Sequence, residues 1–144
     1  MSMYNQFRTD PEAEEKGIIL DYGDFRVTVA RAGGANKRFQ RVLEAKTRPH
    51  QRAIQTNNFD NDRAAVLMKE AFAEAVIRDW EVKKEDGTWE SGIESSDGGV
   101  MPVTKENILK VFEDLPDLFQ DIMTQAQTSM LFRASLREEA AKNS

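Results

Sequence analysis

The chain has 144 residues, 40% of them hydrophobic and 31% charged, with 20 basic side chains, 25 acidic side chains and no cysteine. This length predicts one domain, over residues 1–136, because two domains would each have a marginal core. The missing cysteines exclude a disulfide framework, a thiol nucleophile and any cysteine-ligated zinc or iron–sulfur site.

The apolar residues are spread along the chain and form no membrane segment. No apolar run approaches the roughly 18–20 residues that span a bilayer. The first ten residues, MSMYNQFRTD, also lack the charged-then-apolar order of a signal peptide. We therefore expect a soluble protein that is made and kept in a reducing cytoplasm.

Basic residues are concentrated between Arg26 and Arg52. This segment carries eight basic residues and a single acid, Glu44, so its charge is +7 and the rest of the chain carries −12. A phosphate-binding surface is one interpretation. We favour a second interpretation, in which the segment faces the protein's own acidic half or another subunit. The chain is net acidic and has no nucleic-acid-binding motif, so we do not expect nucleic acid as a partner.

A short helix and a β-hairpin are predicted near the N-terminus. A capping residue ahead of Pro11 indicates a helix over residues 11–16, which Gly17 ends. The apolar run 18–20 and the alternating run 25–31 flank a four-residue spacer with glycine and aspartate, which is typical of a hairpin. Because a lone hairpin is barely stable in water, we expect it to pack on helices.

The pattern predicts a helix over residues 37–47, followed by an ambiguous stretch. Asn36 is placed to cap this helix, its apolar residues follow helical spacing, and Pro49 stops it. Residues 49–59 are ambiguous, with an edge strand around residues 53–56 as one interpretation.

Residues 61–82 carry the clearest helical pattern in the chain. Their apolar stripe is Ala64, Leu67, Met68, Ala71, Phe72, Ala75, Val76 and Trp80. A second apolar line, through Val66, Ala73 and Ile77, lies off this stripe. The helix is therefore expected to be central in the monomer or to lie in an interface, and we favour packing inside the monomer.

Residues 83–101 are rich in glycine, serine and acidic residues. They predict either a flexible insert or a small hairpin around Trp89 and Ile93. The acids lack the regular spacing of a calcium loop, so we expect a solvated loop and no metal site.

Two helices are predicted after this insert. Thr104 caps a helix over residues 105–114, and Pro116 opens a second one over residues 117–139. The polar tail 137–144 should fray. The predicted fold class is α+β, mostly α: a small helical domain with an N-terminal β-hairpin packed on four or so helices.

The sequence contains no catalytic motif. His50 is the single histidine, no GxSxG elbow accompanies it, and Gly33-Gly34 belongs to no phosphate-binding loop. We expect no enzyme activity, no cofactor and no metal. A small helical domain with extra apolar helix surface is typical of a binding or assembly protein.

Three strings resemble the tail assembly chaperones of long-tailed bacteriophages. They are Leu20-Asp21-Tyr22-Gly23-Asp24-Phe25-Arg26-Val27, Ala30-Arg31-Ala32-Gly33-Gly34-Ala35-Asn36-Lys37-Arg38-Phe39 and Leu115-Pro116-Asp117-Leu118-Phe119-Gln120-Asp121-Ile122. The likeness covers roughly residues 4–134 and weakens through 83–101.

The resemblance implies a protein of the host cytoplasm that is absent from the mature virion. Such chaperones bind the tape-measure protein, keep it soluble and help to recruit tail-tube subunits, and this one could be a homo-oligomer. A tape measure is a very long, helix-rich chain whose apolar stripes would otherwise self-associate.

We expect the partner to bind at the helix–proline–helix corner around Pro116. The candidate residues are Phe112, Leu115, Leu118, Phe119 and Ile122. The alternative for each of them is a place in the monomer's own core. Two other functions stay open: a structural tail component, such as a tail-completion or tube-associated subunit, and a nucleic-acid-binding regulator that uses the basic segment.

Overall fold

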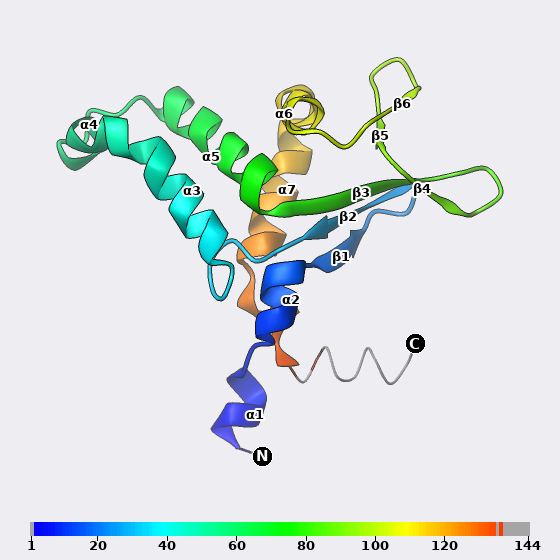
Figure 1. Ribbon diagram of the computed structural model, residues 1–144, viewed down its shortest axis with the longest axis horizontal. Helices are drawn as coiled ribbons and strands as arrows, with labels where there is room; N and C mark the ends of the chain where they lie inside the picture. The colour runs from blue at the N-terminus through cyan, green and yellow to red at the C-terminus, as the bar shows by residue number, and fades with distance from the viewer. Residues whose placement is uncertain (1, 135, 137–144) are drawn as a thin grey trace.

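The computed structural model describes residues 2–134 and 136 and shows an α+β fold built on a four-stranded antiparallel sheet (Figure 1). The strands, in the spatial order β1-β2-β3-β4, are β1 (Ile18–Asp21), β2 (Phe25–Val29), β3 (Ile77–Lys83) and β4 (Trp89–Ser91). The predicted fold class, a mostly helical domain with a lone hairpin, is therefore wrong. The predicted hairpin exists, but β3 and β4 extend it, so half of the sheet comes from chain that was assigned to a helix and a loop.

The β1–β2 hairpin forms as the alternating pattern predicted. Ile18 pairs with Val29 and Leu20 with Val27. In the turn, the Asp21 carboxylate accepts a hydrogen bond from the Gly23 backbone N–H at 2.8 Å, an aspartate turn that closes the spacer.

The helix predicted over residues 61–82 is wrong in its last third. Helix α5 (Asn61–Ala75) ends at Ala75, and β3 begins at Ile77. Trp80, which fits the helical stripe, instead pairs with Val27 in the neighbouring strand and is buried. Once β2 lies alongside, a strand here makes ladder hydrogen bonds on both edges and buries the same apolar residues, so tertiary pairing overrides the helical spacing.

The sheet has one buried and one open face, as antiparallel sheets commonly do. Leu20, Val27 and Trp80 point into the core, whereas Ile19 and Thr28 lie on the other face. Trp89 also lies on this open face, where the Arg26 guanidinium stacks over its ring at 4.2 Å.

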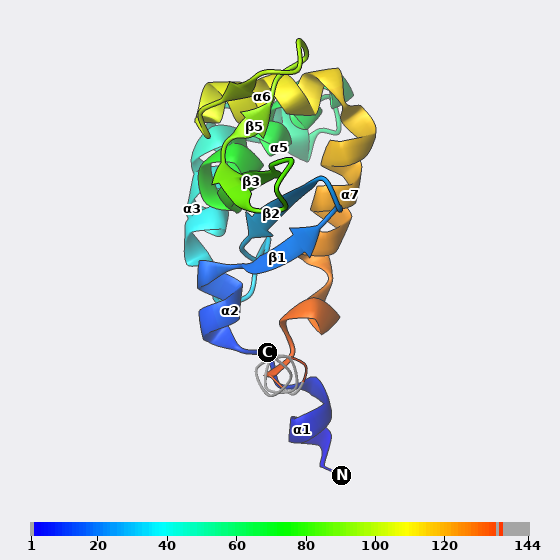
Figure 2. The same ribbon diagram turned by 90° about the vertical axis from the view of Figure 1, so that its right-hand side faces the viewer.

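Helices cover the buried face of the sheet (Figure 2). The helices of the fold are α1 (Met3–Phe7), α2 (Pro11–Lys16), α3 (Lys37–Thr47), α4 (Gln51–Gln55), α5, α6 (Lys105–Asp114) and α7 (Pro116–Gln127), with 3-10 turns at Arg48–His50 and Ser129–Phe132. Helices α1 and α4 lie away from the sheet (Figure 1). The helices predicted over 11–16, 37–47 and 105–114 are confirmed. The edge strand around 53–56 is wrong, because these residues belong to α4, and α1 was not predicted.

The last predicted helix, 117–139, is too long. Helix α7 ends at Gln127, and Thr128 is extended, with its hydroxyl donating to the Thr124 carbonyl at 2.7 Å. The break lets the following turn insert Phe132 fully into the core. Residues 135 and 137–139 of the predicted helix, and the predicted frayed tail 137–144, lie outside the described residues.

Residues 83–101 contain two hairpins. The turn between β3 and β4 is the first, and β5 (Ile93–Glu94) with β6 (Val100–Met101) forms the second. Ile93 is buried in the main core. The predicted single hairpin around Trp89 and Ile93 is therefore right only in part, because Trp89 lies in the first hairpin and Ile93 in the second. Ile93 attaches the segment to the domain.

Helices α3 and α5 pack side by side as an arm that carries α4 at its tip (Figure 1). Within residues 2–134 and 136, no helix combines the length and the apolar character needed to cross a bilayer.

Candidate partner-binding groove

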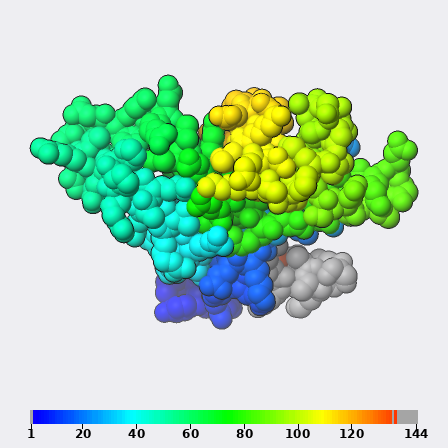
Figure 3. Space-filling model, turned by 45° about the horizontal axis from the view of Figure 1, so that its top comes forward, coloured from blue at the N-terminus to red at the C-terminus, as the bar shows by residue number. Residues whose placement is uncertain are grey.

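A groove of about 310 Å³ lies where the sheet, the β5–β6 hairpin and the α6–α7 corner meet. Figure 3 shows α6 beside the β5–β6 hairpin on the face turned to the viewer. The groove is lined by Phe25, Trp80, Ile93, Glu94, Ser95, Ser96, Met101, Lys110, Val111, Asp114, Leu115 and Leu118. Its floor and one wall are apolar, and its charged residues are Glu94, Lys110 and Asp114.

An aromatic stack forms the sheet side of the groove. The rings of Tyr22 and Phe25 are 4.8 Å apart and nearly parallel, and those of Phe25 and Trp80 are 6.0 Å apart. The Tyr22 hydroxyl donates to the Asp121 carboxylate at 2.5 Å, which ties the β1–β2 turn to α7. Burial, together with this hydrogen bond and the Asp121 charge, raises the pKa of the Tyr22 phenol far above its ordinary value.

The corner between α6 and α7 places Leu115 at the mouth of the groove. Leu115 follows the last residue of α6 and precedes Pro116, whose fixed φ suits the first turn of α7. Its backbone (φ −128°, ψ 74°) is non-helical, as expected before proline. The chain therefore turns here, and the Leu115 side chain stays 53% exposed.

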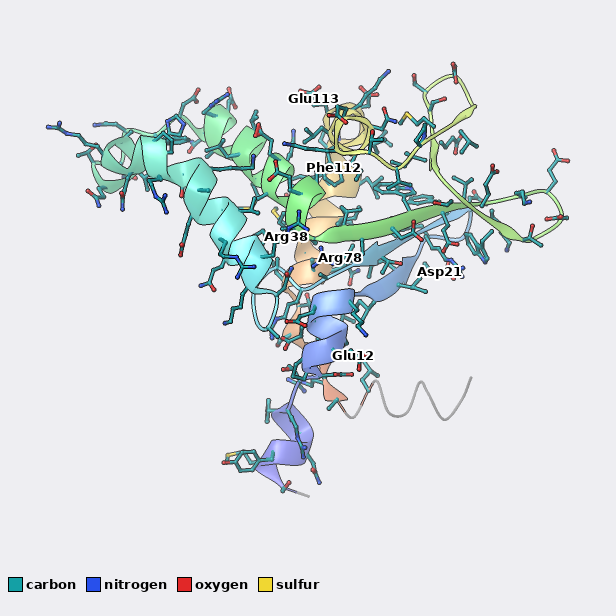
Figure 4. The ribbon with its side chains drawn as sticks, in the orientation of Figure 1. Glu12, Asp21, Arg38, Arg78, Phe112 and Glu113 are labelled. Carbon is teal, nitrogen blue, oxygen red and sulfur yellow. The ribbon has the colours of Figure 1, made fainter. Side chains whose placement is uncertain are left out.

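The five predicted binding residues divide into two groups. Phe112, Phe119 and Ile122 are buried in the domain core, where the rings of Phe112 and Phe119 lie 4.7 Å apart. In Figure 4, Phe112 lies on the side of α6 that faces the domain. Leu115 and Leu118, by contrast, line the groove. The first three residues thus support the corner from beneath, and the last two are accessible to a partner.

Sequence reasoning missed the groove residues that come from other segments. Phe25, Trp80, Ile93 and Met101 belong to four different strands. The hydrophobic alternation of β2 gave a signal for Phe25, but nothing in the spacing relates it to a corner some ninety residues later in the chain. Phe25 and Trp80 meet because β3 pairs with β2, and the β5–β6 hairpin adds Ile93 and Met101.

A buried polar cluster sits at the opposite end of β3 and fixes the strand's start. The Asn36 amide donates to the carbonyls of Arg31 at 2.9 Å and Ala75 at 2.8 Å, and its oxygen accepts from Arg78 at 3.2 Å. Asn36 stands at the cap position of α3, but its side chain makes no capping hydrogen bond there. The capping role predicted for it is therefore wrong, because its side chain binds the end of α5 instead.

Arg78 has no partner across the β2–β3 ladder, since the register shifts there between Thr28 and Val29. Its guanidinium turns to the Ala75 carbonyl at 3.0 Å and the Glu15 carbonyl at 3.0 Å. Burial, and then the nearby charge of Arg38, lower the Arg78 pKa. Figure 4 shows these two arginines near the start of α3.

The basic segment is only partly neutralised by the protein's own acids. Three of its members form ion pairs: Arg26 with Glu81, Arg31 with Glu14, and Lys46 with Glu70 and Glu74. Among the described residues, no ion pair includes the other five, which are Lys37, Arg38, Arg41, Arg48 and Arg52. These five are exposed on and after α3.

His50 packs edge-on against the Phe59 ring, 4.9 Å between centroids. Over the part of the chain that the structure describes, no three histidine, cysteine or carboxylate side chains gather where they could hold a metal ion.

The fold and the groove together define a small α+β protein with an apolar surface groove framed by a helical corner and a β-hairpin. Residues 34–143 match the family described as YdaY prophage protein, and the chain belongs to that family. It is a phage-associated protein, as the resemblance implied. The matched region spans α3 to α7 and so includes the corner, whereas the β1–β2 hairpin lies outside it. No curated protein and no solved structure matches the chain.

Proposed function

We propose that this protein is a phage tail assembly chaperone. It binds helical segments of the tape-measure protein in the groove at the α6–α7 corner, keeps that protein soluble in the host cytoplasm and helps to recruit tail-tube subunits. It acts by binding and without catalysis, and it is absent from the mature virion.

The observation that carries the proposal is the exposure of Leu115 above an apolar groove. Leu118 is half-buried beside it, and Trp80 and Ile93 close the floor. Apolar residues spaced along a partner helix dock in grooves of this kind. Membership of a prophage protein family supports a phage client, and the tape measure is the phage protein that most needs its apolar stripes covered.

The charged rim of the groove suits reversible binding of a client. Glu94 and Asp114 stand with Lys110 around the apolar floor, so a client meets charged side chains at the edge and apolar ones in the centre. Interfaces with a small apolar centre and a polar rim provide specificity with limited affinity. A chaperone that must release its client requires this balance.

The test is co-expression of the tape-measure protein with wild-type or Leu115→Ser chaperone. Serine is a favoured residue before the first turn of a helix, so this change removes the apolar side chain without disfavouring the start of α7. Full burial of a leucine contributes about 1.5–3 kcal/mol, and we expect the variant to bind the tape measure about tenfold more weakly or worse. Less tape measure should then stay in the soluble fraction and co-purify.

Ile19→Ser is the matched control. Ile19 is 54% exposed, nearly the same as Leu115, but it lies on the open face of the sheet away from the groove. We expect it to bind as wild type does. Equal co-purification by Leu115→Ser, or a tape measure that is equally soluble without this protein, contradicts the proposal. Mass spectrometry of purified virions adds a second criterion, since a stoichiometric amount in particles favours a structural tail component instead.

A further inference from the structure

We propose that α1 of one copy docks in the groove of a second copy, so that the protein assembles head to tail. The inference uses the same groove as the proposed function, but it concerns this chain by itself and does not depend on a tape measure.

Helix α1 presents an apolar surface that is largely exposed among the described residues. Met3, Tyr4 and Phe7 are 68%, 70% and 62% exposed, although each is a large apolar or aromatic side chain. Met3 and Phe7 are four residues apart and share one face of the helix, with Tyr4 beside them. A five-residue helix is far shorter than the roughly 12–15 residues that are marginally stable alone in water, so α1 needs a surface to pack on.

The base of α1 is fixed to the domain. Thr9 forms a β-bridge with Arg133, the Asp10 N–H donates to the Phe132 carbonyl at 2.7 Å, and the Ala134 N–H donates to the Arg8 carbonyl at 2.8 Å. These bonds hold the segment after α1 against the end of the chain's last described turn. Helix α1 therefore projects from a defined place and does not swing freely.

The groove lies at the opposite end of the molecule. In Figures 1 and 2, α1 is at the bottom of the view, and α6 and β5 are at the top. With its base fixed, α1 cannot reach the groove of its own chain. A second copy can bring its α1 there, and the contact then joins two different surfaces.

The charges of α1 and of the groove favour α1 of a second copy as the occupant. Residues 2–8 contain one basic residue, Arg8, and no acid, and Arg133 stacks on the Phe7 ring at 4.6 Å. The charged residues of the groove are two acids, Glu94 and Asp114, and one base, Lys110. A weakly basic apolar helix thus meets a weakly acidic apolar groove, which is the complementarity that orients a contact.

A contact between two different surfaces leaves one free α1 and one free groove at the ends of every open assembly. It therefore generates a ring if the rotation closes and an open filament if it does not. It also means that a client helix and a neighbouring α1 compete for one groove, so that self-assembly covers the apolar surface until a client displaces it.

The experiment is light scattering of the purified full chain over a concentration series. We expect the wild type and the Ile19→Ser control to rise above the monomer mass as concentration increases. Leu115→Ser, which alters the groove, and Met3→Ser with Phe7→Ser, which alters α1, should each remain monomeric at concentrations where the wild type assembles. Circular dichroism checks that both variants are folded.

The decisive experiment mixes the two variants. The first keeps an intact α1 and the second an intact groove, so an equimolar mixture should form a dimer and nothing larger. A wild type that is monomeric at every concentration overturns the inference. So does a mixture that stays monomeric, or a groove variant that assembles like the wild type, as it would if two α1 helices simply packed on each other. None of these outcomes bears on tape-measure binding, so this inference and the proposed function fail separately.

Discussion

Asn36→Asp tests whether the buried polar cluster or helix capping explains the asparagine between β2 and α3. Aspartate and asparagine are about equally good at the N-cap, so a capping role predicts little change. In the structure the side chain is 3% exposed and uses both amide hydrogens away from the helix, toward the carbonyls of Arg31 and Ala75. Aspartate cannot donate to either.

The expected cost follows from these contacts. Each lost hydrogen bond contributes about 1 kcal/mol, and the Arg31 carbonyl loses this donor, which adds part of a desolvation penalty of about 1–3 kcal/mol. The Ala75 carbonyl keeps its bond from Arg78, and the Arg78 charge beside the new carboxylate offsets some of the loss. We expect Asn36→Asp to lower the free energy of unfolding by about 2–3 kcal/mol.

Urea unfolding at pH 7, followed by tryptophan fluorescence to which buried Trp80 contributes, measures this difference. Asn58→Asp is the control, because Asn58 is exposed and its amide bonds one neighbouring hydroxyl; it should stay within about 0.5 kcal/mol of wild type, as surface substitutions usually do. An Asn36→Asp protein that is equally close to wild type would refute the reasoning and restore the capping interpretation.

Two further predictions concern ionisable groups that join separate elements. Burial works to raise the pKa of Glu74, but hydrogen bonds from Lys105 and Lys46 outweigh it, so the pKa lies below its ordinary value of 4.5. The ionised Glu74 carboxylate therefore stabilises the fold above pH 4.5, and this contribution is lost as the pH falls below that value. We expect Glu74→Gln to cost about 0.5–1 kcal/mol at pH 7, since solvent screens this partly exposed group, and progressively less in parallel urea unfolding as the pH falls below 4.5; a cost that does not shrink with falling pH contradicts the ionic origin. Burial, and then the Asp121 carboxylate, raise the pKa of Tyr22 above its ordinary value of 10.0. The protonated phenol therefore contributes its full stabilisation of the fold below pH 10.0, and this contribution is lost as the pH rises above that value. We expect Tyr22→Phe to cost about 1 kcal/mol at neutral pH and to remove a late-titrating phenol from the ultraviolet titration, and an unchanged titration would count against the Tyr22–Asp121 bond.

Local signals in the sequence fixed the elements that depend on neighbouring residues. Proline and glycine at the two ends of α2 set its bounds, and Gly17 has φ +107°, a conformation that other residues rarely adopt. The alternation of residues 25–29 identified β2, and Pro116 identified the corner that carries Leu115. These features act within a few residues of one another, so a linear pattern is enough to find them.

Longer-range pairing decided the rest of the sheet. The segment 76–82 is compatible with helical spacing and with a strand, and the choice depends on whether β2 lies beside it. The turn after Gln127 is similar, because α7 stops where Phe132 can enter the core. In both places the deciding partner is far away in the chain.

The residues of the groove also divide into those set by local sequence and those set by long-range contacts. The sequence by itself determined that an apolar corner forms at Pro116 and that Leu115 and Leu118 belong to it. Tertiary structure decided which of the corner's apolar residues are accessible, because Phe112, Phe119 and Ile122 fill the core. It also brought Phe25, Trp80 and Ile93 to the corner. Helical periodicity reports which side of a helix is apolar, whereas burial depends on what packs against that side, and that information lies in the contacts between distant segments.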